Sequence, residues 1–152
     1  MSQTIGNPQI NQGTLNVIRT NLQVPAFPQL NVTQSFMGAG GASISWTGPA
    51  TTFINTMTGR VVCPEPFQPV TITVHLVRAQ ALAALWEQQR VSLTPIGDVL
   101  LYGDSMNLPP YSVSNCAIEN VGELTFNARS VEFGVTIGGT YTMNNGLWSL
   151  IV

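Results

Sequence analysis

One run, at residues 69–90, constrains the fold more than any other part of the chain: PVTITVHLVRAQALAALWEQQR. In its first half, apolar and polar residues alternate, with Ile72, Val74 and Leu76 on one side, which is typical of a half-buried strand. In its second half, apolar residues recur at helical spacing around an alanine-rich centre that favours a helix. No glycine, proline or asparagine separates the two halves. We therefore expect a strand that continues directly into the domain's one helix.

The expected helix starts at residue 79 and presents one apolar stripe. Apolar residues at i, i+3, i+4 and i+7 share a helix face, and we expect this face to pack on the sheet. The stripe consists of Ala79, Leu82, Ala83 and Trp86. The same run holds the chain's only histidine, His75, on the polar side of the strand. A lone histidine there is typical of a hydrogen-bonding group at a surface or interface rather than of a catalytic base.

Strand patterns divided by glycine and proline occupy most of the remaining chain. The clearest alternation places Val131, Phe133, Val135 and Ile137 on one face. A weaker strand is expected at residues 30–37, followed by a turn or hinge at GAGG. Seven or eight strands and one helix predict a single mainly β domain over residues 1–152. Its architecture is a β-sandwich or small barrel with one flanking α-helix.

Three segments are poorly suited to a compact domain. Residues 1–13 are rich in glutamine and asparagine, and they predict an extended arm that becomes ordered by docking. Residues 47–66 carry three prolines and two glycines and favour an extended hairpin loop. Connections of that length are usually functional or bound to a partner. The chain ends with the uncharged LWSLIV, which we expect to pair as a final strand.

Charge is unusually scarce in this chain. Only 8% of the residues are charged, against about 25% in an ordinary globular domain. Lysine is absent, and the cations are five arginines. Such a surface is poorly protected against self-association, and interface cores are depleted in charge. The composition therefore predicts a surface largely covered by other protein; the alternative is a neutral monomer rich in Asn, Gln and Thr.

No motif predicts catalysis, a metal or a cofactor. The nucleophile elbow, the P-loop and the HExxH motif are all absent from the sequence. Glu119 and Glu123 would form a carboxylate pair only on a helix, and the local pattern is extended. Cys63 and Cys116 form no CxxC pair, so free thiols are expected, with a disulfide as the alternative. We predict that the protein is not an enzyme.

Nucleic-acid and membrane binding also lack their usual signals. Five scattered arginines and a net charge of −2 cannot neutralise many phosphates. A neutral or mildly acidic channel would nevertheless let DNA slide past. No segment approaches the about 18 apolar residues of a membrane span, and the start has no secretory signal. We expect synthesis in a cytoplasm and no membrane insertion.

Four blocks of sequence carry a resemblance to a known family. They are LNVIRTNLQVP, MTGRVVCPEPFQPVTITVHLVRAQALAALWEQQ, PIGDVLLYGDSMNLPPY and NCAIENVGELTFNARSVEFGVTIGGTYTMN. In their order and spacing, they resemble the tail tube proteins of contractile-tailed bacteriophages. None of the blocks is a catalytic signature.

The resemblance implies a structural subunit of a virion tail, assembled in the host cytoplasm. Six copies would form a ring in which strands join into one continuous barrel around a lumen. The rings would stack into a tube inside a contractile sheath, and DNA would pass through at infection without specific binding. The implied partners are further copies of the chain, the sheath protein, and the baseplate and tail-terminator proteins.

The resemblance also assigns candidate residues. The arm and the loop at 47–66 would reach between rings, and the centre of the loop comprises Thr52, Phe53, Ile54, Asn55, Thr56 and Met57. Glu119, Glu123 and Glu132 are candidates for a mildly acidic lumen. Two alternatives are a tube-like baseplate or tail-tip ring protein of the same fold, and a carbohydrate-binding β-sandwich that uses Trp46, Trp86 and Trp148.

Overall fold

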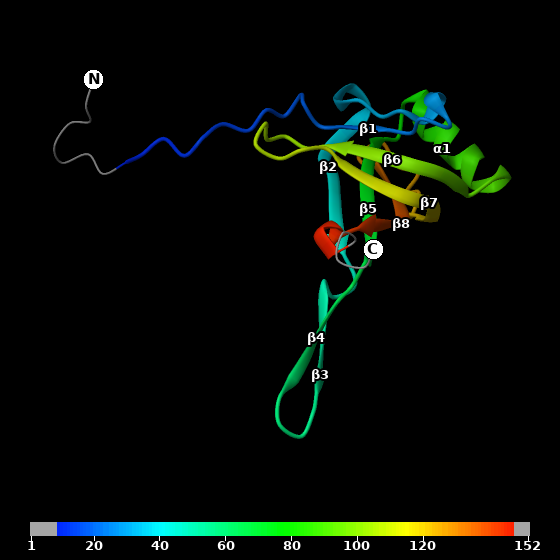
Figure 1. The fold of residues 1–152 in the computed structure, drawn as a ribbon. Coiled ribbons are helices and arrows are strands. Elements are labelled where there is room, and N and C mark those ends of the chain that lie inside the picture. Colours follow the sequence, from blue (N-terminus) through cyan, green and yellow to red (C-terminus); the bar gives the residue numbers. More distant parts are fainter. Residues whose placement is uncertain (1–8, 148–152) are drawn as a thin grey trace.

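A computed structural model describes residues 9–147. Six strands form one sheet in the order β1–β6–β7–β8–β5–β2, with every neighbouring pair antiparallel. Their bounds are β1 Asn21–Gln23, β2 Met37–Trp46, β5 Phe67–Val77, β6 Pro95–Tyr102, β7 Tyr111–Val121 and β8 Glu132–Thr142. The sheet curls so that β6 and β7 run across β2 and β5 (Figure 1), giving a nearly closed barrel. The prediction of a mainly β fold with one helix is confirmed.

The joint between β5 and α1 (Ala81–Ser92) differs in detail from the prediction. A short turn at residues 78–80 separates the two elements, and the Gln80 amide donates to the Val77 carbonyl at 3.1 Å. The helix therefore begins two residues later than expected. Ala79 lies in this turn and is exposed, so its assignment to the packing stripe was wrong. The chain needs this turn to change direction from sheet to helix.

The core lies between the curled sheet and α1. Alternate residues of β5 and β8 point inward, and Ile72 lies opposite Ile137 in the register of the two strands. Trp86 enters this core from the helix and is 1% exposed. Each buried side chain of this size contributes about 1.5–3 kcal/mol. Val131 was expected on the inner face of β8, but it precedes the strand and is exposed.

Bulges give the sheet its curvature. The strand register shifts near Gly41, Gly97 and Asn115, and each of these residues has a positive φ. An extra residue in one strand bends it and increases its twist. The GAGG segment therefore lies inside β2 as a bulge, instead of forming the expected turn or hinge. The weak strand expected at residues 30–37 is also absent.

Three short 3₁₀ helices accompany the larger elements, two between β1 and β2 and one after β8. They are η1 Pro28–Leu30, η2 Gln34–Phe36 and η3 Asn145–Leu147. The residues before β2 thus form mainly helical turns instead of the expected strand. The C-terminal strand expected from LWSLIV lies almost entirely outside the described residues, as does the start of the arm.

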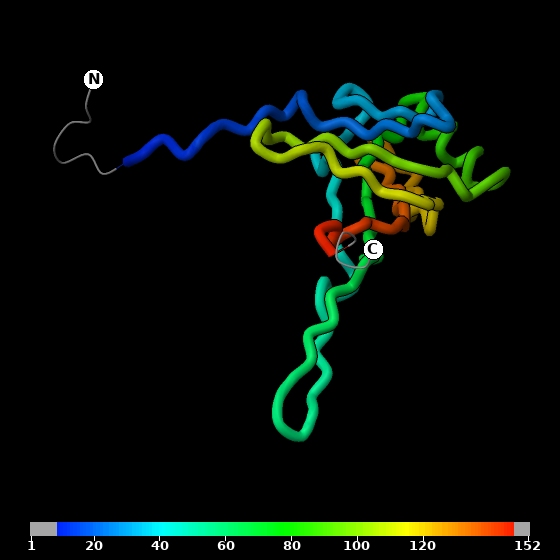
Figure 2. The backbone as a smooth tube through the Cα atoms, in the orientation of Figure 1, coloured from blue at the N-terminus to red at the C-terminus, as the bar shows by residue number. Residues whose placement is uncertain are grey.

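Two segments leave the barrel. Strands β3 (Thr51–Asn55) and β4 (Arg60–Pro64) form a separate two-stranded sheet within the loop expected at residues 47–66. Figure 2 shows this hairpin and the N-terminal arm extending in different directions from the body. Along residues 9–147, no helix is both long and apolar enough to cross a membrane.

Candidate assembly surfaces

The β3–β4 hairpin exposes apolar side chains on both of its faces. Phe53 pairs with Val62, and the next pair along the ladder is Ile54 with Val61. Because successive residues of a strand point to opposite faces, each face carries one of these pairs. All four side chains are about half exposed, and Met57 in the turn is fully exposed. A lone two-stranded hairpin is marginally stable in water, so a covering partner would stabilise it.

Polar contacts within the hairpin fix its shape. At the tip, the Thr56 amide donates to the Gly59 carbonyl at 2.8 Å. The Arg60 guanidinium lies 4.2 Å from the centroid of the Phe53 ring, a cation–π contact that shields one side of the ring. Thr52 is half-buried, and its hydroxyl lies within hydrogen-bond distance of two acceptors, the Glu65 carboxylate at 3.1 Å and the Cys63 carbonyl at 3.3 Å. Asn55 pairs with Arg60 at the end of the ladder.

Among the described residues, the segment without helix or strand continues past the expected 1–13 to residue 19, and this longer segment, called the arm from here on, is the second exposed apolar segment. Ile10, Leu15, Val17 and Ile18 are each more than 60% exposed. The arm joins the body where the Arg19 guanidinium donates to the carbonyls of residues 103 and 105. Beside this joint lies a groove of about 500 Å³, which runs along the bulged part of β2 and is lined by Val17, Ile18, Thr20, Gln34, residues 37–42 and Asp104.

The sheet face that points away from the core, here called the outer face, is small and polar. Across β2, β5, β7 and β8 it presents Ser43, Ser45, Thr71, Thr73, His75, Ala117, Glu119, Glu132, Gly134, Thr136 and Gly138. The sequences of the six sheet strands contain no arginine or lysine, and their acids are Asp98, Glu119 and Glu132. The outer face is therefore neutral to mildly acidic.

The three acids proposed from the sequence occupy different places. Glu119 lies on β7, with its carboxylate over Gly138 of β8, and Glu132 projects from the same outer face. Pairing of β7, β8 and β5 thus brings two of the candidates to one surface. Glu123 lies in the exposed connection after β7, so it does not belong to the sheet face.

His75 contacts one of these acids. Its Nδ1 lies 3.5 Å from Oε2 of Glu132, whose Oε1 accepts a hydrogen bond from the Gly40 amide at 3.0 Å. A Cβ on Gly40 would come within 2.8 Å of the His75 ring, so glycine is required where the bulge crosses this pair. The arrangement holds the β2 bulge against the sheet. The described residues contain no group of three His, Cys, Asp or Glu suited to a metal ion.

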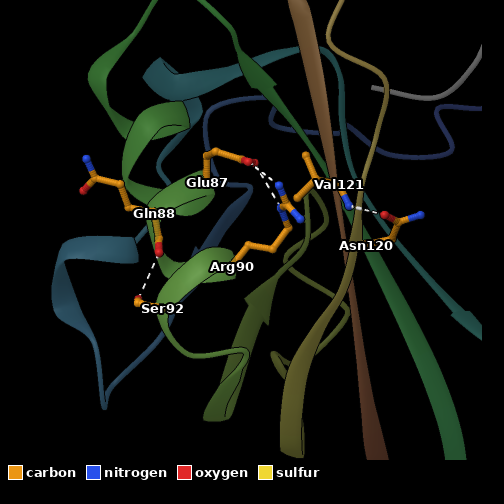
Figure 3. Close-up of polar contacts among 6 residues, drawn as sticks. All are labelled: Glu87, Gln88, Arg90, Ser92, Asn120 and Val121. Atoms are coloured by element: carbon orange, nitrogen blue, oxygen red, sulfur yellow. Dashed lines mark hydrogen bonds and ion pairs between the residues drawn. The ribbon is translucent and has the colours of Figure 1, made fainter.

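The exposed side of α1 and the end of β7 carry ordinary surface contacts. Figure 3 shows the Glu87–Arg90 pair, the Ser92 hydroxyl donating to the Gln88 carbonyl at 2.9 Å, and Asn120 beside Val121. The hydrogen bond from Arg90 lowers the pKa of Glu87. Exposed pairs of this kind add little stability. Phe126, from the connection after β7, stands 83% exposed beside the helix.

Comparisons with known proteins show a similarity at the level of the fold. No protein-family model matches the sequence, and neither does any curated protein. Among solved structures, the fold is similar to the anti-feeding prophage cap, described as the AFP tube terminating cap and determined by cryo-EM. The TM-score is 0.52 at 16% identity, and the match covers 91% of this chain and 98% of the cap. The shared fold therefore includes almost the whole of both chains.

Proposed function

We propose that the chain is a structural, non-enzymatic subunit of a phage-tail-like particle. In this proposal, six copies form a ring, and rings stack into the tail tube inside a contractile sheath. One observation carries it: a barrel with the fold of a tube-terminating cap projects a hairpin that is apolar on both faces. Such a hairpin is suited to insertion against a neighbouring subunit.

Ring formation would also cover an exposed sheet edge. Among the described strands, β2 pairs only with β5, which leaves a ten-residue edge on its other side. Open edges invite uncontrolled association, and closing strands into a ring removes them. If the outer face is turned to the lumen, Glu119 and Glu132 would line the channel. The sheet strands would contribute no arginine or lysine to it. Genomic DNA would pass such a surface without specific binding.

The remaining partners follow from that position in the particle. The chain would contact the sheath protein along the tube and the baseplate and tail-terminator proteins at its ends. It would be assembled in the host cytoplasm and reside in the tail. The residues expected between rings are those of the arm and of the hairpin, including Thr52–Met57, which run from near the hairpin base to its tip.

A tube-terminating or tail-tip ring is the second candidate, and the similarity to the cap supports it about as well as it supports the tube subunit. A carbohydrate-binding module is disfavoured because Trp86 is buried in the core. Trp46 packs edge-on against Tyr111 and Tyr141, with ring centroids 5.7 and 6.2 Å apart. That cluster offers no flat platform for a sugar ring.

Negative-stain microscopy and sedimentation of the purified protein test the proposal. A tube subunit should form stacked rings that lengthen with concentration, whereas a terminating ring should stop at one fixed mass. The double change Ile54→Glu and Met57→Glu should abolish stacking without altering the melting temperature. Val91→Glu, on the exposed side of α1, is the matched control and should still stack. A protein that remains a monomer at all concentrations would refute both candidates.

A further inference from the structure

Several hydrogen bonds attach the hairpin to the barrel. Backbone amides close the joint at two levels: Thr47 donates to the Pro69 carbonyl, and Glu65 donates to the Ala50 carbonyl, both at 3.0 Å. The first bond attaches the chain that enters the hairpin to β5, and the second joins the two chains of the hairpin base to each other. The Met143 amide, just beyond β8, also donates to the Pro66 carbonyl at 3.0 Å. Two side-chain contacts add to these backbone bonds.

Asn144, just beyond β8, makes the first of those contacts. Its side-chain amide donates to the Glu65 carbonyl at 2.7 Å and to the Ala50 carbonyl at 3.3 Å. One side chain thus binds both chains of the hairpin base to a different part of the sheet. In Figure 1, η3 lies beside this base. Asn144 has φ +54°, a left-handed conformation that asparagine tolerates better than most residues.

Gln68, at the start of β5, makes the second contact. It is 7% exposed, and its side-chain amide donates to the carbonyl of Gly48 in the chain that enters the hairpin. Burying an amide is costly unless it is hydrogen-bonded. A glutamine among the apolar inward-facing residues of β5 is therefore accounted for by this bond to the hairpin base.

We propose that Asn144 and Gln68 are positioning residues that hold the β3–β4 hairpin in one direction relative to the barrel. The side-chain amide of Asn144, just beyond β8, and that of Gln68, in β5, both donate hydrogen bonds to the hairpin base. A free subunit therefore presents a hairpin that is already oriented, rather than a loop that becomes ordered when a partner binds. That this orientation helps subunits to assemble rests on the proposed function. Preorganisation reduces the entropy that a contact loses on forming.

Distances between two spin labels test the proposal directly. Labels are placed on Met57→Cys at the hairpin tip and Gln88→Cys on α1, in a Cys63→Ser background. Cys116 stays unlabelled because burial raises the pKa of its thiol to about 12. Measurements are made at a dilution where sedimentation shows a monomer. The parent protein should give a narrow distance distribution, and Asn144→Gly and Gln68→Leu should each broaden it.

These two substitutions remove the side-chain amide, the first without adding backbone strain and the second without a large change in side-chain volume. Glycine keeps the left-handed backbone without strain, and leucine keeps the volume of Gln68. Asn115→Gly is the matched control, because Asn115 also has a positive φ and lies in β7. Amide exchange at Glu65 should accelerate about tenfold in Asn144→Gly, as expected for the loss of two hydrogen bonds, and remain unchanged in Asn115→Gly.

An unchanged distance distribution in the Asn144→Gly/Gln68→Leu double variant would overturn the proposal. Equal broadening in Asn115→Gly would also overturn it, because the effect would then be a general loosening of the barrel. Both readouts concern the isolated subunit. If the protein never assembles, the proposed function fails while a narrow, Asn144-dependent distribution still supports the positioning role.

Discussion

At the scale of single residues, Gly139 in β8 lies where the barrel leaves no room for a larger side chain. A Cβ there would overlap Cγ1 of Val113 and lie 2.7 Å from Sγ of Cys116. Gly139→Ala should therefore lower the free energy of unfolding by about 1–3 kcal/mol, as overpacking does. Urea denaturation measures this change. Gly134→Ala on the same strand meets no atom within 4 Å and should be neutral or slightly stabilising; equal losses in both variants would contradict the packing argument.

Cys116 should make stability depend on alkaline pH. Burial, and secondly the Asp98 carboxylate, raise the pKa of its thiol from 9.0 to about 12. The folded protein therefore keeps the proton that the unfolded chain releases. This contribution to stability is complete below the unfolded pKa near 9 and is lost as pH rises from there towards 12. The expected result is that the stability difference between the parent and Cys116→Ala shrinks between about pH 8 and about pH 10.5. Parallel curves from urea denaturation would contradict it.

At the scale of elements, α1 is attached to the barrel mainly through Trp86. This side chain is 1% exposed, and truncating such a residue leaves a large cavity. Trp86→Ala should cost roughly 3–5 kcal/mol of unfolding free energy, measured by chemical denaturation. Leu85→Ala on the same helix is the control, because Leu85 is 37% exposed. If both variants unfold at the same denaturant concentration, the helix is not held through Trp86.

The joint between β5 and α1 shows what periodicity can and cannot predict. Alternation identified the inward residues of β5, and helical spacing identified Leu82, Ala83 and Trp86 as one face. The same spacing wrongly included Ala79, because the three-residue turn before α1 leaves no mark in a pattern of apolar residues. Val131 was misplaced for a similar reason, since alternation continued by one step beyond the start of β8.

Contacts between residues far apart in the chain could not be predicted from the sequence, for a different reason. Whether Glu132 reaches His75 depends on the register that places His75 opposite Gly134, and no local pattern encodes that register. The same holds for Asn144, whose partners lie in the hairpin base. The resemblance grouped Glu123 with Glu119 and Glu132, but β7 ends at Val121, before it reaches Glu123.

At the scale of the whole molecule, charge is segregated. All five arginines lie outside the six-stranded sheet, on the arm, the hairpin, α1 and the turns beside it. The sheet strands carry three acids and no arginine or lysine, so their formal charge is −3 with His75 neutral. A surface that must let DNA pass is best served by such a distribution, because cations would bind phosphates and hold the DNA in place.

That distribution can be tested by adding one cation to the outer face. Thr73 lies at the centre of this face, opposite Thr136 of β8. If the face lines a lumen, assembled Thr73→Lys should retain short double-stranded DNA that resists added nuclease. Retention should weaken sharply between about 50 and about 200 mM salt, because bound phosphates release counterions.

Val91→Lys places the same charge on the exposed side of α1 and serves as the control. Any DNA that this variant binds lies outside the tube and should be digested, and the parent assembly should retain none. The comparison separates the two possible orientations of the subunit, since a lysine protects DNA from nuclease only where the surrounding ring encloses it. Nuclease resistance in Val91→Lys, with none in Thr73→Lys, would place α1 rather than the outer face towards the lumen.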